Sequence, residues 1–144
     1  MSTITNRTSP LAERKQLLKI IATCLQEYEQ IKDNIHEGED ILALIYLSLE
    51  RIQLLIKQTL KAWEERNYWV KADQFKEEWT WVGGFIDQYY PELICGNRAQ
   101  ITRINSELSK ICNDLRIKPS IKHDKPWKGA HQVLMAKLKH RLKS

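Results

Sequence analysis

The chain has 144 residues, of which 42% are hydrophobic and 28% charged, and its formal net charge is +5 at pH 7. This size can bury one core without disulfide or metal support, so we expect a single domain with a tail. The longest apolar stretch, Ile41 to Leu49, is far shorter than the roughly 20 residues of a membrane-spanning helix. The polar first residues and three widely spaced cysteines argue against a secreted protein, so we expect a cytoplasmic location.

Charge is divided unevenly along the chain. The segment 116–144 contains nine basic residues and one acidic residue, a net charge of +8, whereas residues 1–115 contain 14 basic and 17 acidic residues, a net charge of −3. A dense cationic extension beside a nearly balanced body usually marks a surface for polyanions or for an acidic partner. The sequence therefore indicates the charge of a partner but no chemistry.

Apolar residues at three- and four-residue spacing predict two helices in the first half of the chain. Ser9 is the expected cap of the first helix, with Pro10 in its first turn, and the helix should run to about Ile35, with a glycine stop at Gly38. A second helix is expected from about Ile41 to Trp63. It carries leucines away from its main face, which indicates either a central position in a bundle or cover by another subunit. These leucines are Leu42, Leu47 and Leu54.

The second half of the chain predicts three more helices. A third periodic run should end before Pro91, and a fourth helix should begin at Asn97, with Gln100 in capping-box position, and stop before Pro119. The sequence leaves open whether the second and third helices form one rod or bend. A polar linker leads into a last helix from about Ala130 to Lys143. No run of period-two alternation predicts a strand.

These elements predict an all-α protein, a helical bundle of four longer helices with a short basic C-terminal helix. We expect a helical bundle domain over residues 1–117. Residues 118–144 are expected to form a basic linker and a C-terminal amphipathic helix, because the linker is polar and contains proline.

The last predicted helix has an apolar stripe, Leu134, Leu138 and Leu142, and a basic side. It can finish the core while its lysines are solvated, or it can bind phosphate groups, an anionic membrane surface or a partner's groove. The core and phosphate interpretations are compatible because they use different faces. The candidate nucleic-acid-binding residues are Lys118, Lys122, Lys125, Lys128, Lys137, Lys139, Arg141 and Lys143.

Aromatic residues concentrate between Trp63 and Tyr90. Phe75, Trp79 and Tyr89 share the periodic seam and are expected in the core. Three other aromatic residues lie off that seam and are candidate partner-binding residues, either as interface anchors or as platforms for unpaired bases. They are Trp69, Trp81 and Tyr90. A protein interface is the more frequent explanation of the two.

The sequence lacks patterns of catalytic and metal-binding residues. The four histidines have no i, i+4 spacing to one another or to a cysteine, and no Glu-x-x-His pattern suggests a di-iron bundle. Neither a glycine-rich phosphate loop, nor a nucleophile elbow, nor a kinase signature occurs. We therefore expect no enzyme, no metal and no cofactor.

The sequence favours a non-enzymatic small helical subunit or accessory factor of a larger assembly, which contacts nucleic acid, RNA or DNA, through its basic surface. The alternative is a protein-only adaptor or assembly factor that docks a partner through exposed apolar and aromatic helix faces. For either function we expect a protein partner or a homo-oligomer and no membrane insertion. Salt separates the two functions, because phosphate binding weakens by orders of magnitude from low to moderate salt.

Overall fold

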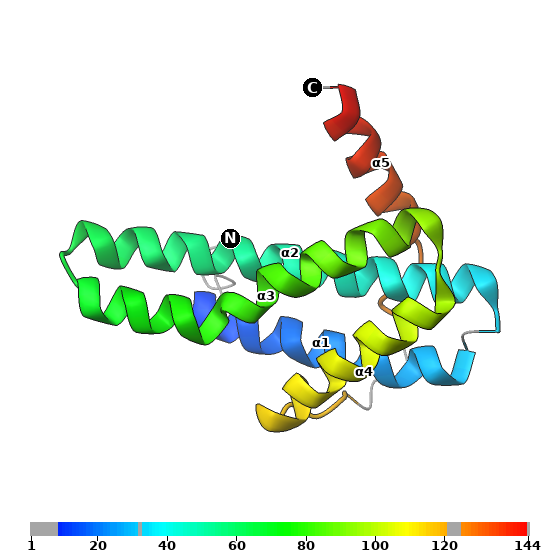
Figure 1. Ribbon diagram of the computed structural model, residues 1–144, viewed down its shortest axis with the longest axis horizontal. Coiled ribbons are helices and arrows are strands. Elements are labelled where there is room, and N and C mark those ends of the chain that lie inside the picture. Colours follow the sequence, from blue (N-terminus) through cyan, green and yellow to red (C-terminus); the bar gives the residue numbers. More distant parts are fainter. Residues whose placement is uncertain (1–8, 32, 121–124, 144) are drawn as a thin grey trace, which may run out of the picture.

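The computed structural model describes residues 9–31, 33–120 and 125–143, and helices account for most of them (Figure 1). The helices are α1 (Pro10–Ile31), α2 (Ile35–Glu65), α3 (Trp69–Cys95), α4 (Arg98–Asp114) and α5 (Ala130–Lys143). No strand occurs in this part of the chain. The predicted fold class, an all-α bundle of four longer helices and a short basic C-terminal helix, is confirmed.

The longest helix, α2, is central to the bundle. It packs against α1, α3 and α5, whereas α4 contacts α3 and α1. Figure 1 shows α2 and α3 as an antiparallel hairpin that extends beyond α1 at the end where the two helices join. The central position explains why α2 is apolar on more than one side. Of its three off-face leucines, Leu42 is buried and Leu47 half-buried, but Leu54 is exposed.

Side-chain caps confirm two of the predicted helix starts. The Ser9 hydroxyl accepts a hydrogen bond from the Ala12 N–H at 3.1 Å, at the start of α1. The Asn97 side chain accepts from the Gln100 N–H, also at 3.1 Å, at the start of α4. Each cap satisfies an N–H group that has no partner within its helix.

Two predicted helix ends are wrong. The Asn34 side chain accepts from the Glu37 N–H at 3.2 Å and caps α2, so Gly38 lies buried inside α2 and does not end α1. The third helix does not stop before Pro91 but continues to Cys95. A proline in the last turns removes only one N–H donor, and Leu93 beyond it packs against the core.

The second and third helices form a hairpin and not one rod. The turn between them is tight, because the Tyr68 N–H donates to the Trp63 carbonyl at 2.9 Å and Asn67 adopts a left-handed conformation with φ of 63°. Farther along the hairpin, the helices approach closely at Gly83. A Cβ atom there would lie 3.1 Å from the Nε2 atom of Gln53, so glycine permits this approach.

The core runs along α2 and joins all five helices. As predicted, Phe75 and Tyr89 are buried, while Trp79 is only half-buried and packs against the edge of the core. The Tyr89 hydroxyl donates a hydrogen bond to Oδ1 of Asn105 at 2.5 Å, which links α3 to α4 through a buried polar pair. The core also includes Leu134 and Leu138 of α5.

Candidate functional site

The basic segment (residues 116–144) crosses the bundle. The Ser120 N–H donates to Oγ1 of Thr23 at 2.7 Å, which attaches the segment to α1. Beyond the gap in the described residues, Trp127 is buried and its indole N–H donates to Glu37 of α2 at 3.4 Å. The segment therefore passes from α1 to α2 before α5 begins.

A carboxylate of α2 caps α5. The Oδ2 atom of Asp40 accepts from the Gly129 N–H at 3.2 Å, and its Oδ1 atom accepts from the His131 N–H at 2.9 Å. Negative charge at a helix N-terminus is favourable because the unpaired N–H groups carry partial positive charge. The helix then buries Leu134 and Leu138 against α2, so the core interpretation of its apolar stripe holds for these two leucines. Leu142 is exposed.

Three predicted nucleic-acid-binding residues have carboxylate partners within the protein. The Lys125 ammonium lies 3.2 Å from Glu37. The Lys137 ammonium and the Arg141 guanidinium lie 3.6 Å and 3.0 Å from Glu50, respectively. Acidic residues of α2 therefore neutralise part of the +8 charge of the basic segment.

The Glu50 pairs are part of a larger polar group at the α2–α5 contact. Burial and the nearby Glu50 carboxylate raise the pKa of the Tyr46 hydroxyl, which also interacts with Arg141. Burial alone would lower the pKa of Arg141, but its bonds to Glu50 and Tyr46 raise it. The charged form of Arg141 is thus stabilised by its partners in α2.

The other predicted cations are dispersed. Lys118, Lys128 and Lys139 are exposed and form no ion pair with any described residue. Ser120, close to Lys118, contacts α1, whereas α5 contacts α2 but neither α1 nor α4 among the described residues. Lys139 therefore belongs to a helix that makes no contact with α1. Lys122 and the Lys143 side chain lie outside the described residues.

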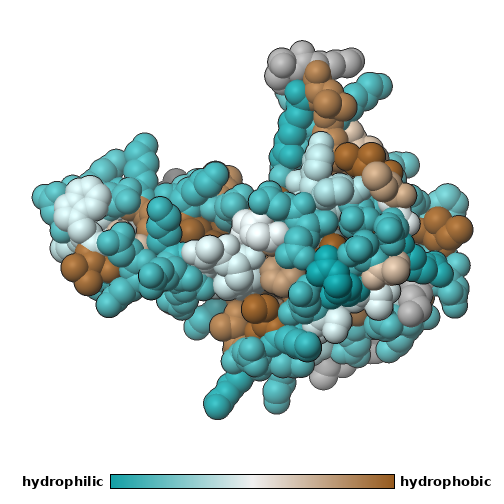
Figure 2. All heavy atoms as spheres, in the orientation of Figure 1, coloured by the Kyte–Doolittle hydropathy of each residue, from teal (hydrophilic) through white to brown (hydrophobic). Residues whose placement is uncertain are grey.

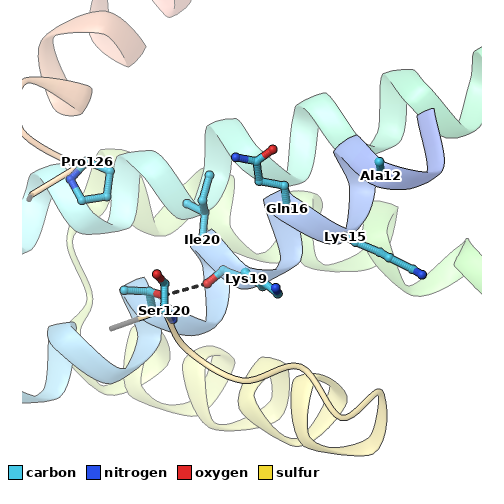
Figure 3. A pocket seen from close by; sticks show the side chains of 8 residues that line it. Ala12, Lys15, Gln16, Lys19, Ile20, Ser120 and Pro126 are labelled. Atoms are coloured by element: carbon cyan, nitrogen blue, oxygen red, sulfur yellow. Dashed lines mark hydrogen bonds between the residues drawn. The ribbon is translucent and has the colours of Figure 1, made fainter. Parts of the chain in front are cut away.

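A hollow of about 570 Å³ lies where the basic segment crosses α1 (Figure 3). Lys15, Lys19 and Thr23 line it at four-residue spacing on one face of α1, and Ser120 and Pro126 lie across from them. No carboxylate is among the eight lining residues, and neither lysine has an ion-pair partner in the described part of the chain. This side of α1 is therefore cationic.

The predicted nucleic-acid-binding residues do not include these two lysines. That prediction followed the high charge density of residues 116–144, whereas residues 1–115 have a net negative charge. The signal was present as two lysines at i, i+4 spacing with no carboxylate at the neighbouring position on that face. Lys118 lies two residues before Ser120, which lines the hollow, and it is exposed with no ion-pair partner among the described residues. We call Lys15, Lys19 and Lys118 the α1 cation group.

The candidate partner-binding aromatic residues lie in different surroundings. Trp81 is half-buried, with its ring 5.9 Å from Trp79 and 6.1 Å from Phe85, centroid to centroid. Tyr90 is exposed and its ring lies 6.2 Å from that of Tyr46. Trp69 is exposed at the first residue of α3. The three residues do not form one site.

Exposed apolar area is concentrated at the hairpin tip (residues 66–71). Tyr68, Trp69 and Val70 are 49%, 56% and 73% exposed. Figure 2 shows pale and brown atoms at this end, over the turn between α2 and α3, among hydrophilic neighbours. Lys71 places its ammonium 5.8 Å from the Trp63 ring and 5.9 Å from the Tyr68 ring, as in cation–π contacts. Of these three exposed residues, only Trp69 is among the partner-binding residues predicted from the sequence.

The buried thiols are poor nucleophiles at neutral pH. Burial raises the pKa of Cys24 to about 12 and that of Cys112 to about 11. Among the residues that the structure describes, no group of three or more histidine, cysteine, aspartate or glutamate side chains could hold a metal ion. None of the described helices is long and apolar enough to cross a membrane.

No family model matches the sequence, and no curated protein or solved structure matches the chain.

Proposed function

We propose that the protein is a non-enzymatic helical subunit or accessory factor that contacts nucleic acid through the α1 cation group. Binding to a phosphate backbone requires cations that are free to replace its counterions. Lys15, Lys19 and Lys118 are exposed and have no carboxylate partner in the described part of the chain. The observation that supports the proposal is the hollow beside α1, whose lining includes two of these lysines and no carboxylate.

The cations of α5 are weaker candidates. Lys137 and Arg141 would have to leave Glu50 to bind a phosphate, and Glu50 is mostly buried, so its charge would lose its partners. Lys128 and Lys139 have no ion-pair partner to leave among the described residues, so they can add contacts to a long nucleic acid. We therefore assign the main contact to α1 and a secondary one to α5.

Contacts of this kind provide affinity without reading a sequence. Lysine ammonium groups on one helix face match the spacing of phosphates only loosely, and phosphate contacts carry no base information. The expected behaviour is sequence-independent binding, with dissociation constants of about 10⁻⁴ to 10⁻⁶ M at physiological salt.

The test compares two triple variants that lose the same charge. In the first, Lys15, Lys19 and Lys118 become glutamine; in the control, Lys57, Lys61 and Lys76 become glutamine, since these exposed lysines of α2 and α3 have no ion-pair partner in the described residues. Binding of labelled mixed-sequence RNA and DNA is followed by fluorescence anisotropy over a range of salt. For a duplex, the first variant should lower the slope of log K against log salt by about 2.7, at about 0.9 per phosphate contact.

The control variant should retain the wild-type slope. Equal losses in the two variants would show that net charge alone matters, and the α1 cation group would not be the site. The proposal fails altogether if the wild-type protein shows no salt-dependent binding to RNA or DNA at low ionic strength.

The exposed hairpin tip favours the second candidate, a protein-only adaptor. Aromatic residues in such a position are typical anchors of protein interfaces. A complex formed through this apolar surface should persist at salt concentrations that abolish binding to phosphates, so co-purification at high salt, with nuclease added, distinguishes the adaptor from the nucleic-acid-binding subunit.

A further inference from the structure

Arg14 of α1 is a largely buried cation without an anionic partner in the described part of the chain. The residue is only 6% exposed, and its buried Nε atom has no hydrogen-bond partner. Its guanidinium forms no ion pair with any described residue. Burial lowers the pKa of Arg14, and the charge of Glu78 partly offsets this effect, but an arginine stays charged at neutral pH. Removing such a charge from water is unfavourable unless an anion compensates it.

Aromatic rings of α3 surround this cation. The guanidinium carbon of Arg14 lies 5.0 Å from the ring centroid of Phe75 and 5.3 Å from that of Trp79. The Trp79 ring stacks on that of Trp81, with centroids 5.9 Å apart and an interplanar angle of 28°. Phe75 is buried, but both tryptophans are half-buried, so they reach the surface. We call these four residues the arginine–aromatic cluster.

The arginine–aromatic cluster adjoins the α1 cation group. Arg14 directly precedes Lys15, which lines the hollow beside α1 together with Lys19. Successive residues of a helix are about 100° apart around its axis, so Arg14 is the next cation around α1 from Lys15 toward α3. A polyanion that crosses α1 at Lys15 therefore meets Arg14 and then the tryptophans.

The carboxylates of these two segments leave the surface cationic. Residues 10–23 of α1 have three basic residues and one acidic residue, Glu13, whose carboxylate is paired with Arg51 at 2.7 Å. Residues 71–81 of α3 have two lysines and three carboxylates, a net charge of −1. The positive charge of α1 therefore exceeds the negative charge that α3 brings to the cluster.

We propose that the ligand of the α1 cation group is a single-stranded nucleic acid, with a phosphate at Arg14 and a base stacked on the Trp79–Trp81 pair. This inference rests on the proposed contact with nucleic acid and adds its substrate class. An arginine can contact aromatic rings and bind a phosphate together, because its N–H donors lie in the plane of the guanidinium. Stacking on an aromatic side chain accepts any base but requires that the base is unpaired. The bases of a duplex stack on one another, so the cluster selects single strands.

Two strands of equal charge test the base contact. One is a short oligothymidine, and the other has the same backbone with abasic sites in place of the bases. The wild-type protein should bind oligothymidine about tenfold more tightly, a factor within the range for stacking of one base, and only oligothymidine should quench tryptophan fluorescence. Trp81→Leu should make the two affinities equal. The matched control, Trp69→Leu at the hairpin tip, should keep the tenfold difference.

A second variant, Arg14→Met, tests the phosphate contact. It places an apolar side chain of similar length among the rings, and replacing a buried charge in this way is often neutral for stability. For oligothymidine, the slope of log K against log salt should fall by about 0.7, the contribution of one phosphate contact to a single strand. Lys57→Met removes an exposed lysine of α2 and should keep the wild-type slope. Circular dichroism checks the helix content of every variant.

The outcomes separate this inference from the proposed function. Equal wild-type affinities for the two strands overturn the inference, and so does a tenfold difference that persists in Trp81→Leu. A folded Arg14→Met variant with the wild-type slope overturns it as well. In each of these cases, salt-dependent binding that requires Lys15 and Lys19 still supports the proposed function. If the wild-type protein shows no salt-dependent binding to any nucleic acid, both are overturned.

Discussion

At the scale of single residues, carboxylates of α2 decide which cations of the basic segment are available. Glu37 pairs with Lys125, and Glu50 accepts both Lys137 and Arg141. Exposed pairs contribute little to stability, but Glu50 is mostly buried and serves two cations, so its loss leaves both without their partner. The position of α5 depends in part on this one side chain.

We expect Glu50→Gln to lower the free energy of unfolding by about 1 kcal/mol, because two charge-assisted contacts become weaker neutral ones. Urea denaturation at low salt measures the change. The control is Glu107→Gln, which removes an exposed pair with Arg103 on one helix and should cost at most about 0.5 kcal/mol. If the two variants lose the same stability, Glu50 does not hold α5 in place.

At the scale of elements, the structure distinguishes helices that build the bundle from one that is added to it. The α2–α3 hairpin, α1 and α4 pack on one another, whereas α5 contacts only α2 among the described helices. The division into residues 1–117 and 118–144 remains a prediction. It requires that the first part folds without the second, although α5 covers apolar surface of α2.

We expect a chain without residues 128–144 to keep cooperative thermal unfolding and most of its helix content, because the four longer helices retain their mutual contacts. Its free energy of unfolding should fall by about 3 kcal/mol, since burial of the Leu134 and Leu138 side chains is lost. Circular dichroism during heating and in urea gives both quantities. Loss of a cooperative transition would show that α5 belongs to the same folding unit and that the division is wrong.

At the scale of the whole molecule, the surfaces of the two candidate functions are separate. The α1 cation group lies beside the crossing of the basic segment, whereas the hairpin tip lies at one end of the molecule, beyond α1. A nucleic acid bound along α1 therefore leaves the hairpin tip accessible to a protein partner.

We therefore expect contact with nucleic acid to be independent of the hairpin tip. A variant with Trp69→Asp and Val70→Asp should bind a short RNA with the wild-type salt slope, whereas the α1 triple variant should lower that slope. Fluorescence anisotropy over a range of salt provides the comparison. A tip variant with a lower slope would show that the two surfaces are not independent.

Local sequence patterns were sufficient to predict the helices and much of the core. Apolar spacing and local caps such as Ser9 and Asn97 act over a few residues, so they can be recognised without tertiary structure. Two helix ends differ from those that the local pattern predicts. Asn34 caps α2 at a position where the apolar spacing predicts a continuous first helix, and α3 continues past Pro91 to Cys95, with Leu93 packed against the core.

Which charges and aromatic residues are available to a partner depends on contacts between segments that are distant in the sequence. Lys137 and Glu50 are far apart in the sequence, so no local pattern shows that they pair. The same holds for Thr23 of α1 and Ser120 of the basic segment, which form a hydrogen bond beside the hollow that Lys15 and Lys19 line. Nor does the sequence show that Trp81 is half-buried while Tyr90 is exposed. The interaction energy of a charge depends on its distance from other charges, and the packing of the helices sets these distances.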